Sequence, residues 1–285
     1  MEEKMKRKIF CIILIISICI FPIWAQQIIT FKPYLPKDTF LLGEPIDFGM
    51  TLTNNSNSII KEQFVKIVRF RILNEDNKPL SYKGRVMFNM SGLVLTLKPR
   101  EAAYPIFDLI GLYGQEYKLA PLYQYIPIGK YTIEVTFTPP NKEKRIINVP
   151  FQVVLPEGEE AEVYNNFMRT VKSKHSASEV VNILQSLYQN NPSSVYNPFI
   201  LMLLDAEYDI VLKNHEKAFE VRKELIEHYP SSGYAHQMLG GILKSMTTDS
   251  ERTVFLEKIK TNCRSEFMKN SYEQQIQTIK AKESH

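Results

Sequence analysis

The spacing of hydrophobic residues changes once along the chain, within the stretch Phe151–Glu162. Before this stretch, apolar and polar residues alternate with a period of two, which is typical of half-buried β-strands. After it, apolar residues recur every three or four positions, which is typical of amphipathic helices. Pro156 and Gly158 end a strand and precede a helix. The pattern therefore predicts a β-domain at 27–155, a linker and helix start at 156–162, and a helical domain at 159–285.

The predicted β-domain consists of short alternating runs separated by turn residues, with no helical period among them. Its clearest run is 46–52, where every second residue from Ile46 to Leu52 is apolar. Short strands at this spacing favour a two-layer antiparallel β-sandwich. We expect its strands at 28–35, 39–42, 46–52, 65–73, 84–90, 93–97, 131–137 and 146–155.

The predicted helical domain contains a short internal sequence repeat. Leu187–Tyr196 reads LYQNNPSSVY and Leu225–Tyr234 reads LIEHYPSSGY, an offset of 38 residues. In both copies a helix stops before proline and two serines are placed to cap the next helix. We expect helices at 159–173, at 176–189 after a serine cap, at 196–212, and on either side of Cys263 near the end of the chain.

The first 25 residues have the three parts of a secretory signal peptide. Basic residues at positions 4–8 precede an apolar run from Ile9 to Ala25, and Ala25 suits signal peptidase. The run is shorter than the roughly 20 residues that a membrane-spanning helix needs. We therefore expect export to the periplasm, cell envelope or extracellular space, with no membrane insertion after cleavage. Retention of the segment as an uncleaved anchor is the alternative.

Composition excludes several functional classes. The formal net charge of +4 falls to about +2 without residues 1–25, which carry 4 basic and 2 acidic side chains. Nucleic-acid binding is not expected, because neither half has concentrated basic charge. After cleavage Cys263 is the last cysteine, so no intramolecular disulfide forms, and a lone thiol is usually a buried small apolar group.

No motif names a reaction or a ligand. G-x-S-x-G, the P-loop and G-x-G-x-x-G are absent, and the mature histidines lack zinc-ligand spacing. Glu224 and His228 share a helix face, which indicates a solvated helix end rather than a metal corner. The pair Gly240-Gly241 indicates close helix packing. We expect no catalytic residue, no cofactor and no metal site.

Two segments of the β-domain resemble bacterial immunoglobulin-like modules. Leu41–Ile46 (LLGEPI) is similar to the opening of such modules. Gly129–Val135 (GKYTIEV) is similar to their penultimate strand, where a tyrosine ties the loop to the sheet. The cysteine pair and core tryptophan of antibody domains are absent, so the resemblance implies a fold and says little about function.

The helical domain resembles the tetratricopeptide family, with Ala206 and Ala218 where that family places small packing residues. Its period of 38 residues exceeds the usual length of about 34. The whole chain is thus similar to bacterial exported proteins in which an immunoglobulin-like β-sandwich precedes a tetratricopeptide-like helical solenoid.

Two surfaces are candidates for binding. In the predicted loop 111–129, clustered tyrosines could stack on a sugar or simply cover the sandwich edge; they are Tyr113, Tyr117, Tyr123 and Tyr125. In the helical domain, stacked helix pairs form a concave groove, which predicts a peptide site. Its candidate residues are Asp205, Tyr208, Asp209, Tyr234, His236 and Gln237.

These patterns favour a non-catalytic exported scaffold or adaptor that binds a protein partner, with Lys or Arg in the bound segment. The competing interpretation is that Tyr208 and Tyr234 are core residues at helical spacing. The first alternative function is a carbohydrate-binding module that uses loop 111–129, and a less favoured one is a hydrolase accessory.

Overall fold

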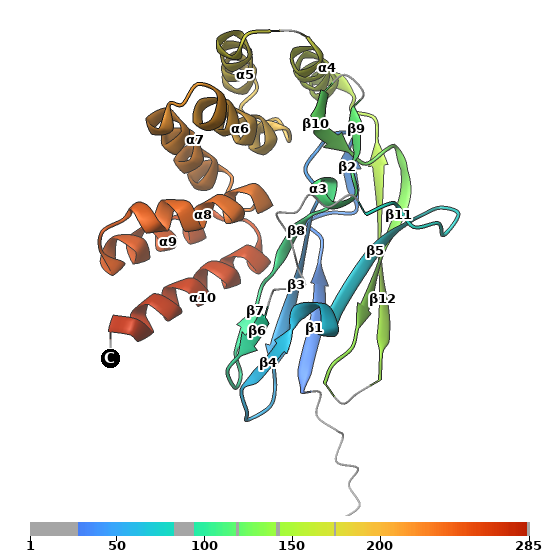
Figure 1. Ribbon diagram of the computed structural model, residues 1–285, viewed down its shortest axis with the longest axis vertical. Helices are drawn as coiled ribbons and strands as arrows, with labels where there is room; N and C mark the ends of the chain where they lie inside the picture. Colours follow the sequence, from blue (N-terminus) through green and yellow to red (C-terminus); the bar gives the residue numbers. More distant parts are fainter. Residues whose placement is uncertain (1–27, 83–93, 118–119, 141–142, 174, 284–285) are drawn as a thin grey trace, which may run out of the picture.

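The computed structural model describes residues 28–82, 94–117, 120–140, 143–173 and 175–283. Strands occupy the chain from Ile29 to Val154, and helices occupy it from Gly158 onward (Figure 1). The change of hydrophobic period therefore marks the change of structure, as predicted. The β region and the helices lie side by side, with the helices along the edge that carries β7 and β8.

Two four-stranded sheets form most of the β region. One has the order β1-β3-β7, with β8 also paired to β3, and the other has the order β2-β12-β11-β5. All pairs are antiparallel except β2 with β12, which is parallel. Their strands are β1 (Ile29–Tyr34), β2 (Thr39–Leu41), β3 (Asp47–Asn54), β5 (Val68–Asn74), β7 (Ala102–Ala103), β8 (Ile106–Asp108), β11 (Gly129–Phe137) and β12 (Arg145–Val154).

One hydrophobic core joins the two sheets. Alternate residues of β3 and β11 are buried, Phe48 and Leu52 on the first strand and Ile133 and Val135 on the second. Side chains of this kind exclude water from both inner faces, and each fully buried one stabilises the fold by about 1.5–3 kcal/mol. The apolar residues that alternate in the sequence of these strands are therefore the ones buried between the two sheets.

Some predicted strands differ from the structure. The run predicted at 65–73 begins as a helical turn, α2 (Phe64–Ile67), and extends only from residue 68. The predicted loop 111–129 contains the end of a short helix, α3 (Leu109–Tyr113), and then a hairpin of β9 (Gln115–Tyr117) and β10 (Ala120–Tyr125). The strand predicted at 84–90 lies outside the described residues, and β6 (Val94–Leu97) pairs with β4 (Ile60–Gln63).

The helices begin and end close to the predicted positions. They are α4 (Gly158–Lys172), α5 (Ala177–Asn190), α6 (Asn197–Ala206), the π-helix η3 (Glu207–Val211), α7 (His215–His228), α8 (Gly233–Ser245), α9 (Asp249–Asn262) and α10 (Glu266–Glu283). The predicted serine cap at 176 is a full capping box, because Ser176 and Glu179 each bond the other's backbone amide.

The two copies of the Pro-Ser-Ser sequence form the same local structure. Ser194 accepts a hydrogen bond from the amide of Tyr196 at 3.2 Å, and Ser232 accepts one from the amide of Tyr234 at 3.2 Å. Each hydroxyl thereby satisfies a backbone donor at a helix start. The two similar sequence segments thus form the same hydrogen bond at the start of a helix.

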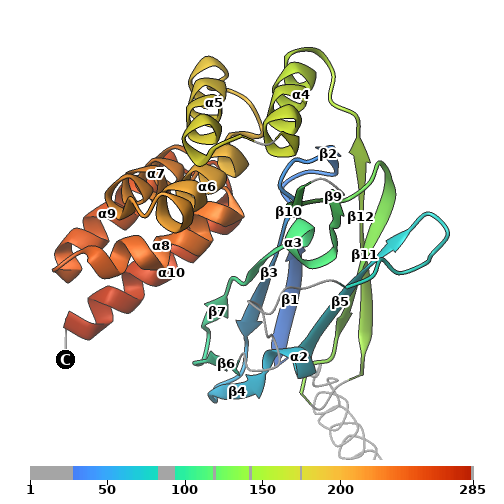
Figure 2. The ribbon, with the colours of Figure 1, turned by 45° about the horizontal axis from the view of Figure 1, so that its top comes forward.

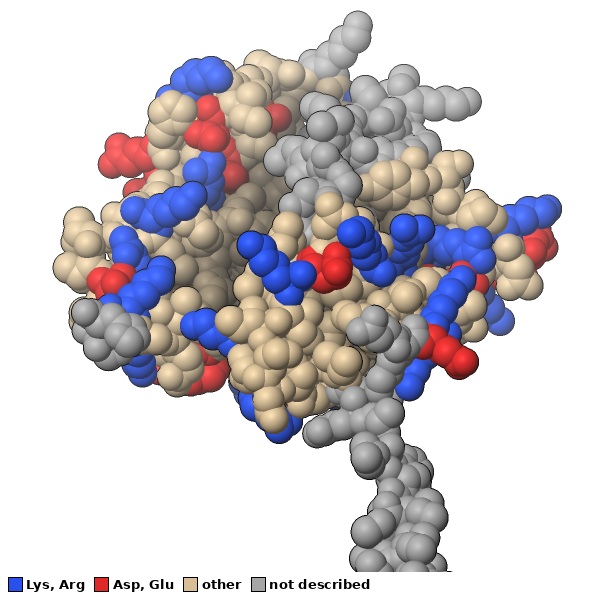
Figure 3. Space-filling view, turned by 60° about the horizontal axis from the view of Figure 1, so that its bottom comes forward, with Lys and Arg blue, Asp and Glu red and all other residues tan. Residues whose placement is uncertain are grey.

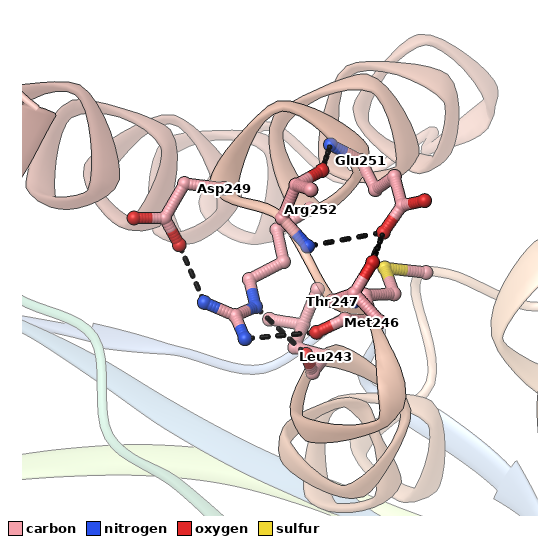
Figure 4. A network of polar contacts seen from close by, with 7 residues as sticks. Leu243, Met246, Thr247, Asp249, Glu251 and Arg252 are labelled. Atoms are coloured by element: carbon pink, nitrogen blue, oxygen red, sulfur yellow. Dashed lines mark hydrogen bonds and ion pairs between the residues drawn. The ribbon is translucent and has the colours of Figure 1, made fainter.

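A polar network fixes the junction of α8 and α9 (Figure 4). Arg252 reaches back to α8, where its guanidinium donates to the carbonyls of Leu243 and Met246 at 2.9 Å each, and it also pairs with Asp249. Glu251 accepts from the amide and hydroxyl of Thr247 at 2.9 and 3.0 Å. The carbonyls at the end of α8 are thereby satisfied, and Thr248 caps α9 by accepting from the amide of Glu251 at 3.1 Å.

Contacts cross from the helices to the β region at both ends of their interface. The ring of Phe267 stacks on Tyr34 with centroids 4.3 Å apart, and the Tyr34 hydroxyl lies 2.8 Å from that of Ser265. At the other end of the interface, Tyr196 donates to the carbonyl of Leu42 at 2.9 Å. Helices α6, α8 and α10 thus dock onto the β region by their N-terminal ends.

Two smaller predictions can be compared with the structure. Cys263 is 3% exposed, which confirms a buried thiol. Gly240 and Gly241 are exposed, and a Cβ built at either one meets no atom within 4 Å. The close helix packing predicted for these glycines is therefore wrong.

Candidate functional site: a cleft between the β region and the helices

A cleft of about 640 Å³ lies between the two parts of the molecule. Its first wall is the segment 36–47, which contains β2 and the turn before β3. Its second wall consists of the ends of three successive helix pairs, at 188–198, 228–232 and 262–264. Both copies of the Pro-Ser-Ser sequence, at 192–194 and 230–232, contribute residues to the second wall.

Hydrogen bonds hold the three turns of the helical wall in a row. The hydroxyl of Tyr229 donates to the carbonyl of Pro192 at 3.1 Å, which joins the first turn to the second. Ser231 accepts from the amides of Arg264 and Ser265 at 3.2 and 3.3 Å, which joins the second turn to the third. Rigid walls of this kind need little ordering when a ligand binds.

The carboxylates on the β wall are engaged within the protein. Glu44 pairs with Lys37 at 2.6 Å and accepts from the amide of Leu41 at 2.8 Å. Burial nevertheless raises the pKa of Glu44 above its usual range. Asp47 accepts a 2.6 Å hydrogen bond from the amide of Gly233, the first residue of α8.

Asp47 has a second carboxylate beside it. Asp108 is its direct partner in the β3–β8 register, and Asp108 caps α3 by accepting from the amide of Ile110 at 2.9 Å. The Tyr234 hydroxyl lies 3.4 Å from the other Asp108 oxygen. Burial raises the pKa of Asp47 to about 7 and that of Asp108 to about 6, because it penalises the ionised form.

Carboxylates with raised pKa values are sometimes catalytic acids, but these two cap helices. Each has an oxygen bonded to the first amides of a helix, and one Asp47 oxygen is buried without a hydrogen-bond partner. Within the described residues, no group of three or more His, Cys, Asp or Glu side chains is arranged to hold a metal ion. The arrangement serves docking of the helices onto the sheet.

The predicted groove residues do not form a surface of their own. Tyr208 is only 4% exposed, and its hydroxyl accepts from the Gln185 amide at 2.8 Å. Tyr234 is buried against the β region. Both assignments to an exposed groove are therefore wrong, because these rings fill the core at helical spacing.

The acidic residues of the predicted groove are also occupied. Arg222 pairs with Asp205 at 2.7 Å and with Asp209 at 2.8 Å, and His215 bonds the other Asp209 oxygen at 2.6 Å. Both carboxylates are thus already paired with basic side chains of the protein itself. On α8, His236 is half-buried, burial lowers its pKa, and Gln237 is exposed.

The tyrosines of 111–129 do not share one environment. Tyr113 is 5% exposed and donates to the carbonyl of Phe70 at 2.9 Å, so its proposed part in a sugar platform is wrong. Tyr125 is half-buried at the end of β10. The side chains of Tyr117 and Tyr123 lie outside the described residues.

The face in Figure 3 carries Lys and Arg interspersed with Asp and Glu over the described residues. This mixture agrees with the modest net charge of the chain. In the described part of the chain, no helix is both long and apolar enough to span a bilayer.

Comparison with known proteins adds little to this geometry. No family model and no curated protein matches the chain. A β-glucosidase from Listeria innocua is 15% identical with a TM-score of 0.29, over 44% of this chain and 16% of that enzyme. A β-glucosidase from Erythrobacter marinus is 13% identical with a TM-score of 0.29, over 44% and 15% of the two chains.

A third similar structure is the CARDB domain of a Pyrococcus furiosus protein, in complex with di-metal ions. It is 13% identical with a TM-score of 0.27, over 45% of this chain and 94% of that domain. This chain spans only about a sixth of the length of the glucosidases. At these scores the matches support no functional inference.

Proposed function

We propose that the protein is a non-catalytic, exported scaffold that binds an extended segment of a protein partner in the cleft between its β region and its helices. The observation that carries this proposal is the cleft itself, about 640 Å³ with walls built by turns. Prolines and aromatic rings such as Tyr188 and Tyr229 line it beside polar groups, a mixture that suits peptide recognition.

We also propose that the β region is an immunoglobulin-like sandwich and that the helices form a tetratricopeptide-like repeat. An immunoglobulin-like sandwich is supported by the common core of the two sheets and by Tyr131, whose hydroxyl donates to the carbonyl of Pro127 at 2.8 Å. A tetratricopeptide-like repeat is supported by the matching helix starts at Ser194 and Ser232. Both families are common scaffolds for recognition, and function depends on the site each one carries.

Export is supported by the pattern of Met1–Ala25, which lies outside the described residues. N-terminal sequencing of protein from the cell envelope or medium tests it, with a mature chain beginning near Gln26 expected. A chain that retains Met1 would instead support the anchored alternative.

Site-specific photo-crosslinking tests the binding proposal. A photoreactive residue replaces Ser193 in the cleft, and a control replaces Lys61, which is exposed on β4. The proposal expects a defined protein adduct from position 193 in intact cells and none from position 61. Adducts that are the same at both positions, or absent from both, would refute it.

A further inference from the structure

We infer that the partner segment bound in the cleft is acidic: an extended stretch with two or more Asp or Glu side chains. This inference rests on the proposed function, since it specifies the chemistry of the same site. It follows from which polar groups of the two walls remain free.

Four side chains of the helical wall are exposed and have no hydrogen-bond or ion-pair partner among the described residues. They are Ser193, His228, Asn262 and Arg264, and they come from the ends of three successive helix pairs. All four can donate hydrogen bonds, and Arg264 carries a permanent positive charge. Ser193, His228 and Asn262 can also accept hydrogen bonds, whereas Arg264 only donates, so the one permanent charge among these four side chains is positive.

The β wall leaves no carboxylate free to attract a cation. Glu44 is neutralised by Lys37, and Asp47 is directed at Gly233, with a Cβ on that glycine reaching to 2.1 Å from an Asp47 oxygen. The helix starts do not add free donors either, because Ser194, Ser232 and Asp47 already bond the amides there. Electrostatic complementarity therefore favours an anionic segment.

The geometry of the row sets the length of this segment. Helix pairs stack at about 10 Å, so a row of three turns is about 20 Å long, which about six extended residues cover. An acidic residue near Arg264 would form a bidentate pair, the strongest contact this wall offers. Asn262 and Ser193 are suited to donate hydrogen bonds to main-chain carbonyls of the bound segment.

Selection from a phage-displayed library of random 12-residue peptides tests the inference, with the purified chain as bait. We expect the enriched peptides to carry Asp or Glu at two or more positions. Synthetic copies, labelled with fluorescein, are then measured by fluorescence polarisation. Binding should weaken several-fold when NaCl rises from about 50 to about 500 mM, because exposed charges are screened.

Three variants distinguish the effect of the Arg264 charge on binding from the effect of free volume in the cleft. Arg264→Glu reverses the free charge without touching the Arg264 amide that bonds Ser231, and it should weaken binding at least tenfold. Ser193→Trp places a large ring in the cleft and should block binding of any occupant beside position 193. Arg145→Glu is the matched control, since Arg145 is exposed at the opposite end of β12, and it should change affinity less than twofold. Thermal melting of each variant confirms folding, and Arg264→Gln replaces Arg264→Glu if that variant is unstable.

The outcomes are distinct. Enriched peptides that are basic or uncharged, and that Ser193→Trp blocks while Arg264→Glu does not, would overturn the acidic partner but leave peptide binding in the cleft intact. Failure to enrich any peptide that Ser193→Trp blocks would overturn both proposals. Binding of an acidic polysaccharide, polygalacturonate, that is lost in Arg264→Glu without any peptide enrichment would assign the cleft to a different class of ligand.

Discussion

The amide of Gly233 donates to the carboxylate of Asp47 across 2.6 Å, although the two residues are 186 positions apart in the chain. The contact joins the first residue of α8 to the first residue of β3. The first amides of a helix have no partner within the helix, and here the acceptor for one of them comes from another part of the fold. Glycine is required because a Cβ would lie 2.1 Å from the Asp47 oxygen.

Replacing Gly233 should therefore weaken the contact between the helices and the sheet. Gly233→Ala is expected to lower the melting temperature by several degrees and to make the chain more sensitive to protease between the two parts. Gly241→Ala in the same helix is the matched control, because a Cβ there meets nothing within 4 Å. That control should stabilise the protein by about 0.5–1 kcal/mol. Equal effects of the two substitutions would contradict the docking role of Gly233.

Stability should fall as pH rises from about 4 to about 7. In this range the unfolded Asp47, with its ordinary pKa of 3.8, loses its proton, while the folded residue, with a pKa of about 7, keeps it. The folded state is thus increasingly disfavoured until pH 7, and the effect is constant above it. Asp108, with its pKa of about 6, acts in the same direction.

Asp47→Asn isolates this contribution from other carboxylates. The groups facing Asp47 are Asp108, Glu44, Tyr34 and Tyr234, and Lys37 is already paired with Glu44. The variant should melt several degrees above the unsubstituted protein at pH 8 and close to it at pH 4. A constant difference at the two pH values would show that Asp47 does not titrate as described.

The stacked rings of Tyr34 and Phe267 should contribute a large part of the docking energy. Phe267 is 7% exposed, and its ring lies over Gly49, where a Cβ would be 2.7 Å away. Phe267→Ala is expected to cost about 3–5 kcal/mol in the free energy of unfolding. A double-mutant cycle with Tyr34→Ala should give a coupling of about 0.5–1.5 kcal/mol. Strictly additive losses would mean that the rings stabilise independently.

Tyr208 should be a core residue rather than a binding residue. Tyr208→Ala is expected to lower the melting temperature by several degrees, because it leaves a cavity and an unpaired Gln185 amide. Capture of a cleft peptide should be unchanged at a temperature where the variant is folded. Tyr208→Phe keeps the ring and should cost only about 1 kcal/mol. Loss of peptide binding without loss of stability would contradict this prediction and support a binding groove that includes η3.

The sequence located the elements of this fold well because local chemistry decides them. The run 129–137 alternates strictly and is a strand, and Ser176 with Glu179 forms the capping box that opens α5. It failed at 65–73 and 111–129, where tertiary packing turns apolar residues into short helices and a hairpin. Neither segment has a period long enough to distinguish helix from strand.

The candidate site shows the same division. The repeated Pro-Ser-Ser sequence located two of the turns that line the cleft, since proline and serine act within a few residues of their own position. Asp47 and Arg264 gave no local signal, because one is a polar residue of an alternating strand and the other is a surface charge. Tyr208 and Tyr234 satisfied the pattern of an exposed helix face equally as well as that of a buried one.

The sequence by itself thus determined the order of strands and helices, the change of period at Phe151–Glu162 and the serine caps. Only the tertiary structure decided that the helices dock by their N-terminal ends on the sheet, that Asp47 meets Gly233, and that a cleft remains between the turns. The physical reason is how far apart in the sequence the interacting residues lie. Periodicity and capping depend on neighbours within about four residues, whereas burial of a side chain depends on which distant surface covers it.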